Sequence, residues 1–352
     1  MKNIMIMAGG TGGHIFPALA VAKALRSQGH QVFWLGTPHG MEGKLVPQHG
    51  FSLDLIPIKN LRGKGWKRYA RLPFHLLRAV LCARRILKEK DISLVVGFGG
   101  YVAGPGALAA KWLRIPLIIH EQNAIPGMTN RYLSKIADQV LMGFPASFKG
   151  LAKAIYTGNP VRDDVLTLAH EKYQPHQPLH VLVIGGSLGA EALNRAVPQA
   201  LLHMEPALRP MLWQQTGEKL FHATQENFKK LPGVLLTPFI DDMNKAYQWA
   251  DLVICRAGAL SVAELAIVGK PAIFIPYPGA VDDHQRKNAE LPSQEGASHL
   301  ILQKELTPDI LADQLSIFSK NPDVLRSMAV KMKALGKPDA TLQVVTVCER
   351  FL

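Results

Sequence analysis

Two glycine-rich loops, each between a short apolar strand and a helix, constrain this fold more than any other feature of the sequence. The first loop, Gly9–Gly13, follows the apolar run Ile4–Met7, and the second, Gly185–Gly189, follows His180–Ile184. Glycine allows the tight turn that returns a helix onto the strand before it. A strand, glycine loop and helix that occur twice predict two Rossmann-like domains.

Further segments support this prediction. The other expected strands are Gln31–Leu35, Leu94–Val96, Pro116–His120, Leu252–Cys255 and Ala272–Ile275, and the helices after the glycine loops are expected to end near Leu25 and Ala200. Strands that alternate with helices predict a parallel, doubly wound sheet, hence an α/β fold. A length of 352 residues fits two domains. The boundary is expected near Asn159–Pro160 or in the stretch Gln174–Pro178.

Two uncharged stretches, Asn3–Ala22 and Ile92–Ala110, are long enough to be mistaken for membrane spans. Both contain several glycines and a proline, which interrupt a membrane helix, so we interpret both as strand–loop–helix units. The three cysteines form no paired pattern, which argues against a disulfide framework or a structural zinc site. With no export signal, we expect a cytoplasmic location.

The net charge of +13 is concentrated in the first half of the chain. Residues 1–160 contain 21 Lys and Arg against 6 Asp and Glu, whereas residues 161–352 contain 19 against 21. Eleven of the basic residues lie between Lys59 and Lys90, with Glu89 as the only acid. This asymmetry indicates an anionic partner for the first half: a lipid surface, a diphosphate or nucleic acid.

The basic segment also contains large apolar residues at roughly helical spacing. Its apolar members are Trp66, Tyr69, Phe74, Leu77 and Leu81, and its basic members include Lys67, Arg68 and Arg71. One interpretation is an amphipathic helix with its apolar face in the core. The other is contact with an anionic bilayer, at about 1 kcal/mol per basic residue near the surface. We favour the membrane, and because no nucleic-acid recognition motif is present, we expect no nucleic-acid partner.

Both glycine loops are candidate phosphate sites, because a helix N-terminus offers N–H groups and partial positive charge. Neither matches GxGxxG followed about twenty residues later by an acid, which disfavours a nicotinamide enzyme. The alternative is that both are simply tight turns. His14, directly after the first loop, is a candidate general base, or else a capping or packing residue.

Glu264 has two interpretations as well. Ser261 at a helix start with Glu264 three residues later matches a capping box, worth about 1 kcal/mol. Alternatively, the carboxylate accepts hydrogen bonds from the ribose of a nucleotide. The run His120–Asn123 (HEQN) closes a strand at the edge where α/β folds bind ligands. The aspartate pairs form no DxD and have no histidine cluster, so we expect no cofactor and no protein-held catalytic metal.

Several longer motifs occur in a fixed order along the chain: MAGGTGGHIFPALAVA, LRGKG, GFGGYVAGP, HEQNAIPG, TGNPVR, GGSLGA, FIDDM, CRAGALSVAELA and DHQRKNA. On these motifs, from Met7 to the C-terminal helix, the chain closely resembles the MurG family of bacterial N-acetylglucosaminyltransferases of peptidoglycan synthesis. The resemblance implies a GT-B fold, with two Rossmann-like domains facing a cleft. Residues 1–162 with the C-terminal helix 337–352 would bind acceptor and membrane, and residues 163–336 would bind the donor.

The reaction implied is transfer of GlcNAc from UDP-GlcNAc to the 4-hydroxyl of MurNAc in lipid I, an undecaprenyl-diphosphate-linked MurNAc-pentapeptide, giving lipid II and UDP with inversion at the anomeric carbon. The implied location is peripheral, on the cytoplasmic face of an anionic cell membrane. Besides UDP-GlcNAc and lipid I, the partners implied are proteins of cell-wall synthesis and division.

The motifs also imply residue roles. Ser187 would meet the donor diphosphate, the Ile240 backbone the uracil, Glu264 the ribose and Gln285 the sugar hydroxyls. His14 would be the general base, with Glu121 as a second catalytic candidate. The other donor-site residues implied are Thr11, Gly12, Gly13, Asn123, Arg162, Ala259, Leu260, Ser261, Val262 and Ala263. The membrane residues are Trp66, Lys67, Arg68, Tyr69, Arg71, Phe74 and Leu77.

Two other functions fit parts of the pattern. A GT-B glycolipid synthase that adds a sugar to diacylglycerol would share the donor half and the basic segment, but not HEQN and GGTGGH as an acceptor diphosphate site. A UDP-GlcNAc 2-epimerase would share the two Rossmann-like domains, but not the aromatic and basic segment.

Overall fold

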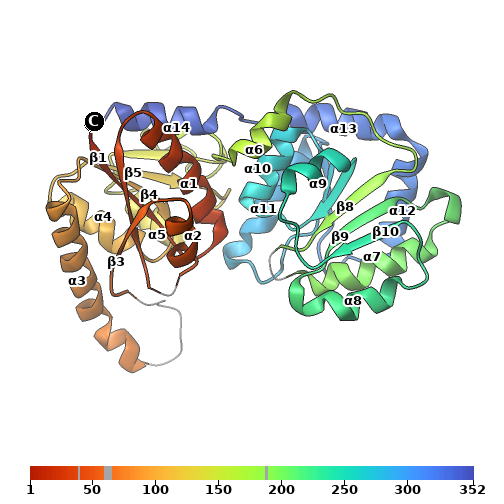
Figure 1. Cartoon of the computed structure of the whole chain (residues 1–352), viewed down its shortest axis with the longest axis horizontal. Coiled ribbons are helices and arrows are strands. Elements are labelled where there is room, and N and C mark those ends of the chain that lie inside the picture. The colour runs from red at the N-terminus through yellow and green to blue at the C-terminus, as the bar shows by residue number, and fades with distance from the viewer. Residues whose placement is uncertain (39, 59–65, 187–188) are drawn as a thin grey trace. The chain divides into compact units, whose positions relative to one another are not determined.

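The computed structural model describes residues 1–38, 40–58, 66–186 and 189–352, with residues 66–72 described by their backbone alone. The chain divides into two compact units (Figure 1). Unit 1 comprises Met1–Arg162 and Pro338–Leu352, and unit 2 comprises Asp163–Lys337. Each unit is built on its own sheet.

Unit 1 contains a seven-stranded parallel sheet with the strand order β3-β2-β1-β4-β5-β6-β7. Its strands are β1 (Asn3–Ala8), β2 (Gln31–Gly36), β3 (Ser52–Leu55), β4 (Leu94–Gly99), β5 (Leu117–Glu121), β6 (Gln139–Met142) and β7 (Ala154–Tyr156). This is the Rossmann order, and it reverses direction between β1 and β4.

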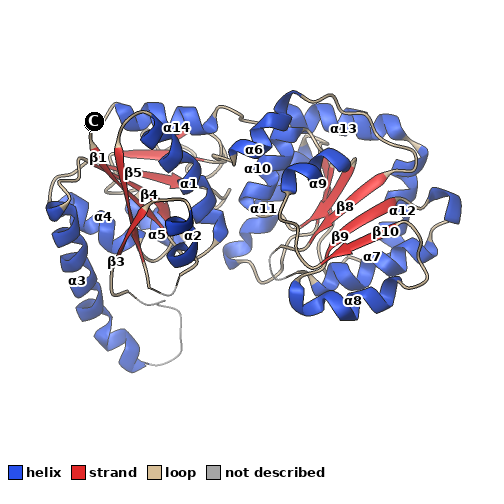
Figure 2. Cartoon of the chain, in the orientation of Figure 1, coloured by secondary structure: helices blue, strands red, loops and turns tan. Residues whose placement is uncertain are grey.

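Helices cover both faces of this sheet (Figure 2). They are α1 (Gly12–Ser27), α2 (Glu42–Gln48), α3 (Trp66–Glu89), α4 (Ala103–Trp112), α5 (Met128–Leu133) and α14 (Ala340–Glu349). Side chains alternate along a strand, so Ile4 and Ile6 pack with α1 and α14, while Met5 and Met7 pack with α3 and α4. The last helix, α14, therefore completes the core of the first unit.

Unit 2 repeats the architecture with a six-stranded parallel sheet ordered β10-β9-β8-β11-β12-β13. Its strands are β8 (His180–Ile184), β9 (Met211–Gln215), β10 (Val234–Thr237), β11 (Leu252–Cys255), β12 (Ala272–Phe274) and β13 (Ser298–Leu300). Its α-helices are α6 (Asp163–Leu166), α7 (Glu191–His203), α8 (Phe221–Phe228), α9 (Met243–Trp249), α10 (Ala259–Val268), α11 (His284–Gln294), α12 (Pro308–Lys320) and α13 (Pro322–Ala334). Short 3-10 helices are η1 (Thr167–His170), η2 (Pro206–Leu208), η3 (Glu218–Leu220) and η4 (Val281–Asp283).

The predicted fold class is confirmed, since both sheets are parallel and doubly wound. Each strand expected from the sequence is present, and its ends differ from the prediction by three residues at most. Both uncharged stretches are strand–loop–helix units, β1 with α1 and β4 with α4. Within the described residues, no helix combines the length and the apolar character that crossing a bilayer requires.

Candidate functional site

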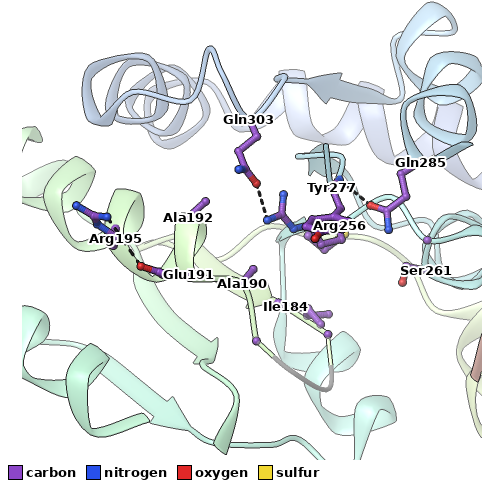
Figure 3. A pocket seen from close by; sticks show the side chains of 15 residues that line it. Ile184, Ala190, Glu191, Ala192, Arg195, Arg256, Ser261, Tyr277, Gln285 and Gln303 are labelled. Carbon is purple, nitrogen blue, oxygen red and sulfur yellow. Dashed lines mark hydrogen bonds and ion pairs between the residues drawn. The ribbon is translucent and has the colours of Figure 1, made fainter. Parts of the chain in front are cut away.

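The strand order of unit 2 brings two sequence motifs together. It reverses between β8 and β11, so the glycine loop after β8 lies beside the loop Arg256–Gly258 after β11. Such a switch point, at the carboxyl ends of parallel strands, is where α/β sheets bind ligands. A cavity of about 800 Å³ opens there. Its lining is Ile184, Gly185, Gly186, Gly189, Ala190, Glu191, Ala192, Arg195, Cys255, Arg256, Gly258, Ser261, Tyr277, Gln285 and Gln303 (Figure 3).

The glycine loop gives the pocket an anion-binding wall. Gly189 has a φ of +75°, and a Cβ there would lie 2.0 Å from the Thr216 carbonyl oxygen, so no larger residue fits this turn. Helix α7 begins directly afterwards, and its N-cap residue, Ala190, makes no side-chain capping bond. Among the described residues, no side chain bonds to the first N–H groups of α7, so they can meet an anion. Ser187, the predicted diphosphate ligand, lies outside the described residues.

Arg256 is a half-buried cation of this pocket that was not among the residues expected from the sequence. Its Nη1 donates to the carbonyl oxygens of Ile275 (3.0 Å) and Pro276 (3.2 Å), and its Nη2 donates to Gln303 Oε1 (2.7 Å). Burial lowers the pKa of Arg256, but a guanidinium stays charged at neutral pH. Within the described part of the chain, no carboxylate pairs with it. Its place at the end of β11, inside the motif CRAG, was the signal available in the sequence.

Two predicted donor residues, Ser261 and Gln285, line the pocket. Gln285 Oε1 accepts the backbone N–H of Tyr277 (2.9 Å), and this bond orients the amide at the pocket wall (Figure 3). The other predicted donor-site residues of this motif, between positions 259 and 263, lie in the first turns of helix α10. Ala259 and Val262 are buried, whereas Leu260 and Ala263 are half-buried.

The capping-box interpretation of Ser261 and Glu264 is wrong. Helix α10 begins two residues before Ser261, and its N-cap is Gly258, which makes no side-chain cap. Ser261 is therefore already inside the helix, and Glu264 lies one turn too late for a box. The carboxylate of Glu264 is 8% exposed and accepts the hydroxyl of Tyr247 (2.9 Å). Its contact with a ribose stays a prediction.

The other predicted donor residues of this unit, and the residue at its boundary, are placed as follows. Ile240 is buried in the loop before α9, whose N-cap is Asp242 through a bond from the Lys245 N–H (3.0 Å). Arg162 is half-buried and is the last residue of unit 1 before the chain enters unit 2.

In unit 1, the first glycine loop also lies at a switch point, between β1 and β4. Thr11 is the N-cap of α1, and Gly12 and Gly13 form its first turn before His14. The loop after β4 approaches closely, because Gly100 has a φ of +83° and a Cβ there would lie 2.3 Å from the Gly9 carbonyl oxygen.

The motif HEQN extends from the end of the neighbouring strand β5. Gln122 Oε1 lies 2.7 Å from His14 Nδ1, so the structure joins the first glycine loop to this motif. Both carboxylate oxygens of Glu121 accept bonds from its own loop: Oε1 from the Asn123 N–H (3.0 Å) and Oε2 from the Gly127 N–H and Asn130 Nδ2 (3.0 Å each). These bonds favour a loop-organising role for Glu121 over the catalytic one. Asn123 is half-buried and its carbonyl oxygen accepts the Ser147 hydroxyl (2.6 Å).

Helix α3 lies entirely within the basic segment Lys59–Lys90. Its inward face is small and aliphatic, with Ala79, Val80, Ala83 and Leu87 in the core. Phe74, Leu77 and Leu81 instead point away from the core, with exposures of 68%, 51% and 46%. The alternative that the apolar residues of the segment face the core is therefore wrong for these three. The side chains of Trp66, Lys67, Arg68, Tyr69 and Arg71 lie outside the described residues.

The apolar surface continues from α3 onto α4, which the sequence did not predict. Helix α4 contributes Leu108 and Trp112, exposed by 42% and 56%. The Arg84 guanidinium of α3 lies 4.9 Å from the Trp112 ring centroid, so the two exposed faces are neighbours. An exposed tryptophan beside a cation is typical of a membrane interface.

One group of described side chains could offer ligand atoms to a metal: His176, His180 and Asp251, with these atoms within 4.8 Å of one another. Asp251 already accepts the N–H groups of His176 and His180 and the Nδ1 of His176. The group lies where β8 and β11 begin, at the opposite edge of the sheet from the pocket. It does not belong to the candidate site.

Two Rossmann-like units, one with an arginine and a helix N-terminus in a pocket at its switch point, are the architecture of the GT-B fold, and the family matches identify the class within it as glycosyltransferases. Residues 4–142 match the glycosyltransferase family 28 N-terminal domain, and residues 180–344 match the family's C-terminal domain.

Two full-length relatives carry the same name, UDP-N-acetylglucosamine--N-acetylmuramyl-(pentapeptide) pyrophosphoryl-undecaprenol N-acetylglucosamine transferase. The one from Shewanella denitrificans is 46% identical over 351 residues, 98% of this chain and 96% of the relative. The one from Azotobacter vinelandii is 47% identical over 348 residues, 98% of both chains.

The crystal structure of Acinetobacter baumannii MurG has a TM-score of 0.86 at 42% identity and covers 99% of this chain and 100% of that one. The UDP-GlcNAc 2-epimerase of Neisseria meningitidis bound to UDP-GlcNAc has a TM-score of 0.71 at 12% identity, covering 99% of this chain and all of that one, which shows a shared fold alone. The chain therefore belongs to the MurG family, within glycosyltransferase family 28, and the resemblance seen in its sequence is confirmed.

Proposed function

We propose that this chain transfers GlcNAc from UDP-GlcNAc to the 4-hydroxyl of MurNAc in lipid I, giving lipid II and UDP. The observation that carries the proposal is full-length identity of 46% to transferases named for this donor and acceptor, together with the pocket of unit 2. Inversion requires one in-line displacement, in which the acceptor oxygen bonds to the anomeric carbon as the bond to the UDP oxygen breaks. The reaction then needs stabilisation of UDP and a base for the hydroxyl proton.

The pocket of unit 2 would supply the first of these. The departing diphosphate gains negative charge, and the N–H groups at the start of α7 and the Arg256 guanidinium would stabilise it as the bond breaks. Ser261 and Gln285 line the same cavity and offer hydroxyl and amide groups to the nucleotide and the sugar. Glu264 would hold the ribose, with Tyr247 fixing its carboxylate.

His14 in unit 1 would supply the base. It stands at the third position of α1, beside the loop Gly99–Gly100 and the motif HEQN. A neutral imidazole at this position could take the proton of the attacking hydroxyl. Glu121 is less suited, because both of its oxygens already accept hydrogen bonds from the loop that follows it.

The surface of α3 and α4 would hold the enzyme on the anionic leaflet that contains its acceptor. Phe74, Leu77 and Trp112 would enter the interface, while the cationic residues around them meet lipid headgroups. The location proposed is thus peripheral, on the cytoplasmic face of the cell membrane. Partners in cell-wall synthesis and division are proposed on the family resemblance alone.

The decisive experiment incubates the chain with UDP-GlcNAc and a lipid I analogue. We expect release of UDP together with a product that carries the GlcNAc–MurNAc disaccharide. Formation of UDP-ManNAc from the donor, with the acceptor unchanged, would instead identify an epimerase. Transfer to diacylglycerol in place of the lipid I analogue would identify a glycolipid synthase.

Membrane contact is tested separately by sedimentation with vesicles containing phosphatidylglycerol. Replacing Phe74 and Trp112 by serine should reduce the bound fraction several-fold, since each would otherwise bury about 1.5–3 kcal/mol of apolar side chain. The matched control is the double replacement of Leu202 and Leu235, exposed apolar residues of unit 2, which should leave binding unchanged. Equal binding by the Phe74/Trp112 variant would contradict the proposed surface.

A further inference from the structure

A chain of three hydrogen bonds, two of them fully buried, connects His14 to the backbone of unit 1, and we call this chain the relay. It passes from His14 through the Gln122 amide and the His120 ring to the carbonyl oxygen of Gly158. The direction of each bond can be assigned, because two of the groups along the chain are carbonyl oxygens that can only accept.

The Gly158 end fixes the tautomer of His120. His120 Nε2 lies 3.0 Å from the Gly158 carbonyl oxygen, so this nitrogen must donate. Complete burial lowers the pKa of His120 to about 4, which keeps the ring neutral at physiological pH. A neutral ring that carries its proton on Nε2 has a lone pair on Nδ1.

The next bond fixes the orientation of the Gln122 amide. Gln122 Nε2 lies 2.9 Å from the His120 carbonyl oxygen and 3.0 Å from His120 Nδ1, and both of those atoms are acceptors. The atom that faces them must be the NH₂ group, which uses its two protons there. The amide oxygen therefore faces His14, because a flipped amide would place its oxygen against two acceptors of His120.

The last bond then fixes His14. Gln122 Oε1 can only accept, so His14 Nδ1, at 2.7 Å, must carry the proton. In the neutral ring, the lone pair is on Nε2, which has no hydrogen-bond partner among the described residues. The ring also lies close to the backbone of Gly99, where an added Cβ would come within 3.1 Å of both Cε1 and Nδ1.

We propose that Gln122 and His120 are positioning residues that hold the neutral tautomer of His14 with Nε2 unprotonated, so that Nε2 is the atom that accepts the acceptor hydroxyl's proton. This inference rests on the proposed function for the identity of the proton donor. The tautomer itself follows from the hydrogen bonds and can be measured without substrate. Neither Gln122 nor His120 would touch the reacting atoms.

The direct test is the ¹⁵N NMR spectrum of the histidine rings of the whole chain at about pH 9, well above the reference histidine pKa of about 6.5. For His14 we expect Nδ1 to be protonated and Nε2 to have the shift of an unprotonated nitrogen. Gln122→Met removes the acceptor with little change in volume and should abolish this preference. A wild-type His14 with its proton on Nε2 would overturn the proposal, and this result requires no variant to fold.

The kinetic test uses a double-mutant cycle with the lipid I analogue. Gln122→Met should lower kcat by about tenfold with KM nearly unchanged, which is less than the 10²–10⁴-fold typical of losing a general base. In a His14→Ala background the same change should have no further effect, because Gln122 acts through His14. An equal loss of kcat in both backgrounds would contradict the relay.

The matched control is Gln214→Met, because Gln214 is a fully buried glutamine of unit 2 that donates to Asn194 Oδ1 (2.8 Å). Gln214→Met should leave the His14 spectrum unchanged. A change in that spectrum would mean that the effect of Gln122→Met comes from a general loss of packing and not from the relay. The two proposals fail separately. Absence of transfer by the wild type refutes the proposed function and leaves the tautomer assignment standing, whereas transfer by a wild type whose His14 has the opposite tautomer refutes the relay alone.

Discussion

Replacing Arg256 by methionine is the sharpest test of the donor pocket. The side chain keeps a similar length and loses its charge and its five N–H donors. Three of those donors bond to Ile275, Pro276 and Gln303, and within the described residues two remain for a ligand. The guanidinium also lies 5.6 Å from the Tyr277 ring centroid, so it is held in place before any ligand arrives.

The expected loss follows from those two donors. A hydrogen bond to a charged group contributes about 1.5–3 kcal/mol, and the two together, after partial replacement by water, give about 2–4 kcal/mol. This corresponds to a UDP dissociation constant raised by about 30- to 1,000-fold. The variant also leaves the Gln303 amide oxygen and two carbonyl oxygens without a donor, which lowers stability by about 1–3 kcal/mol. The melting temperature of unit 2 should fall by several degrees.

The assay is titration calorimetry with UDP, below the melting temperature of the variant. The matched control is Arg195→Met, since Arg195 lines the same pocket but is mostly exposed, and its ion-pair partner among the described residues, Glu191, is 3.9 Å away. An exposed pair contributes at most about 1 kcal/mol, so this variant should weaken UDP binding by less than about fivefold. Unchanged UDP affinity in folded Arg256→Met, or an equal loss in both variants, would refute the reasoning.

Four further outcomes are expected. His14→Ala should lower kcat by about 10²–10⁴-fold and leave UDP affinity unchanged, and near-normal turnover would remove it as the base. Glu264→Gln should weaken UDP binding about tenfold or more while the chain stays folded, as calorimetry and circular dichroism would report. Gly189→Ala should abolish UDP binding, because the new Cβ meets the Thr216 carbonyl oxygen, whereas retained binding would mean that the turn relaxes freely. The free energy of unfolding should fall by about 3 kcal/mol from pH 7 to pH 4, because His120 has a pKa of about 4 when folded and about 6.5 when unfolded, so the unfolded state binds the proton first. Denaturation measured over this pH range, with His120→Gln as the reference, tests this dependence.

The parts of the fold that could be predicted from the sequence are those buried on both faces. β11, and β8 after His180, are continuous apolar runs at the centre of their sheet, and the predicted ends of both strands were correct to the residue. Strands β3, β6, β7, β9, β10 and β13 were not predicted. β3, β7 and β10 lack fully buried side chains, and β7 and β13 are three residues long. Glutamines limit the apolar runs of β6 and β9 to three residues, so neither alternation nor an apolar run marks these strands.

The site was predictable where a motif directly follows a central strand. Ser261 and Gln285 line the pocket, and His14 stands beside HEQN, although 108 residues separate it from Gln122. The spacing of residues in the sequence could not show where a helix begins or which groups surround a side chain. Ser261 with Glu264 fits a capping box by spacing, yet the helix starts earlier, directly after the extended residue Gly258.

Both glycine loops lie at the switch point of the same strand order, but Arg256 beside the loop of unit 2 is charged, whereas the side chains of the relay that reaches His14 in unit 1 are neutral. In unit 2 the loop is accompanied by Arg256, a cation with no carboxylate partner in the described residues, and such a site favours an anion. In unit 1 the loop is accompanied by His120, which burial keeps neutral, and by the amide of Gln122, so the nearest links to His14 carry no charge. A base must keep its lone pair, and an adjacent anion would favour the protonated ring instead. The uncharged relay therefore orients His14 through hydrogen bonds alone, whereas an aspartate or glutamate in the place of Gln122 would put a charge beside the ring.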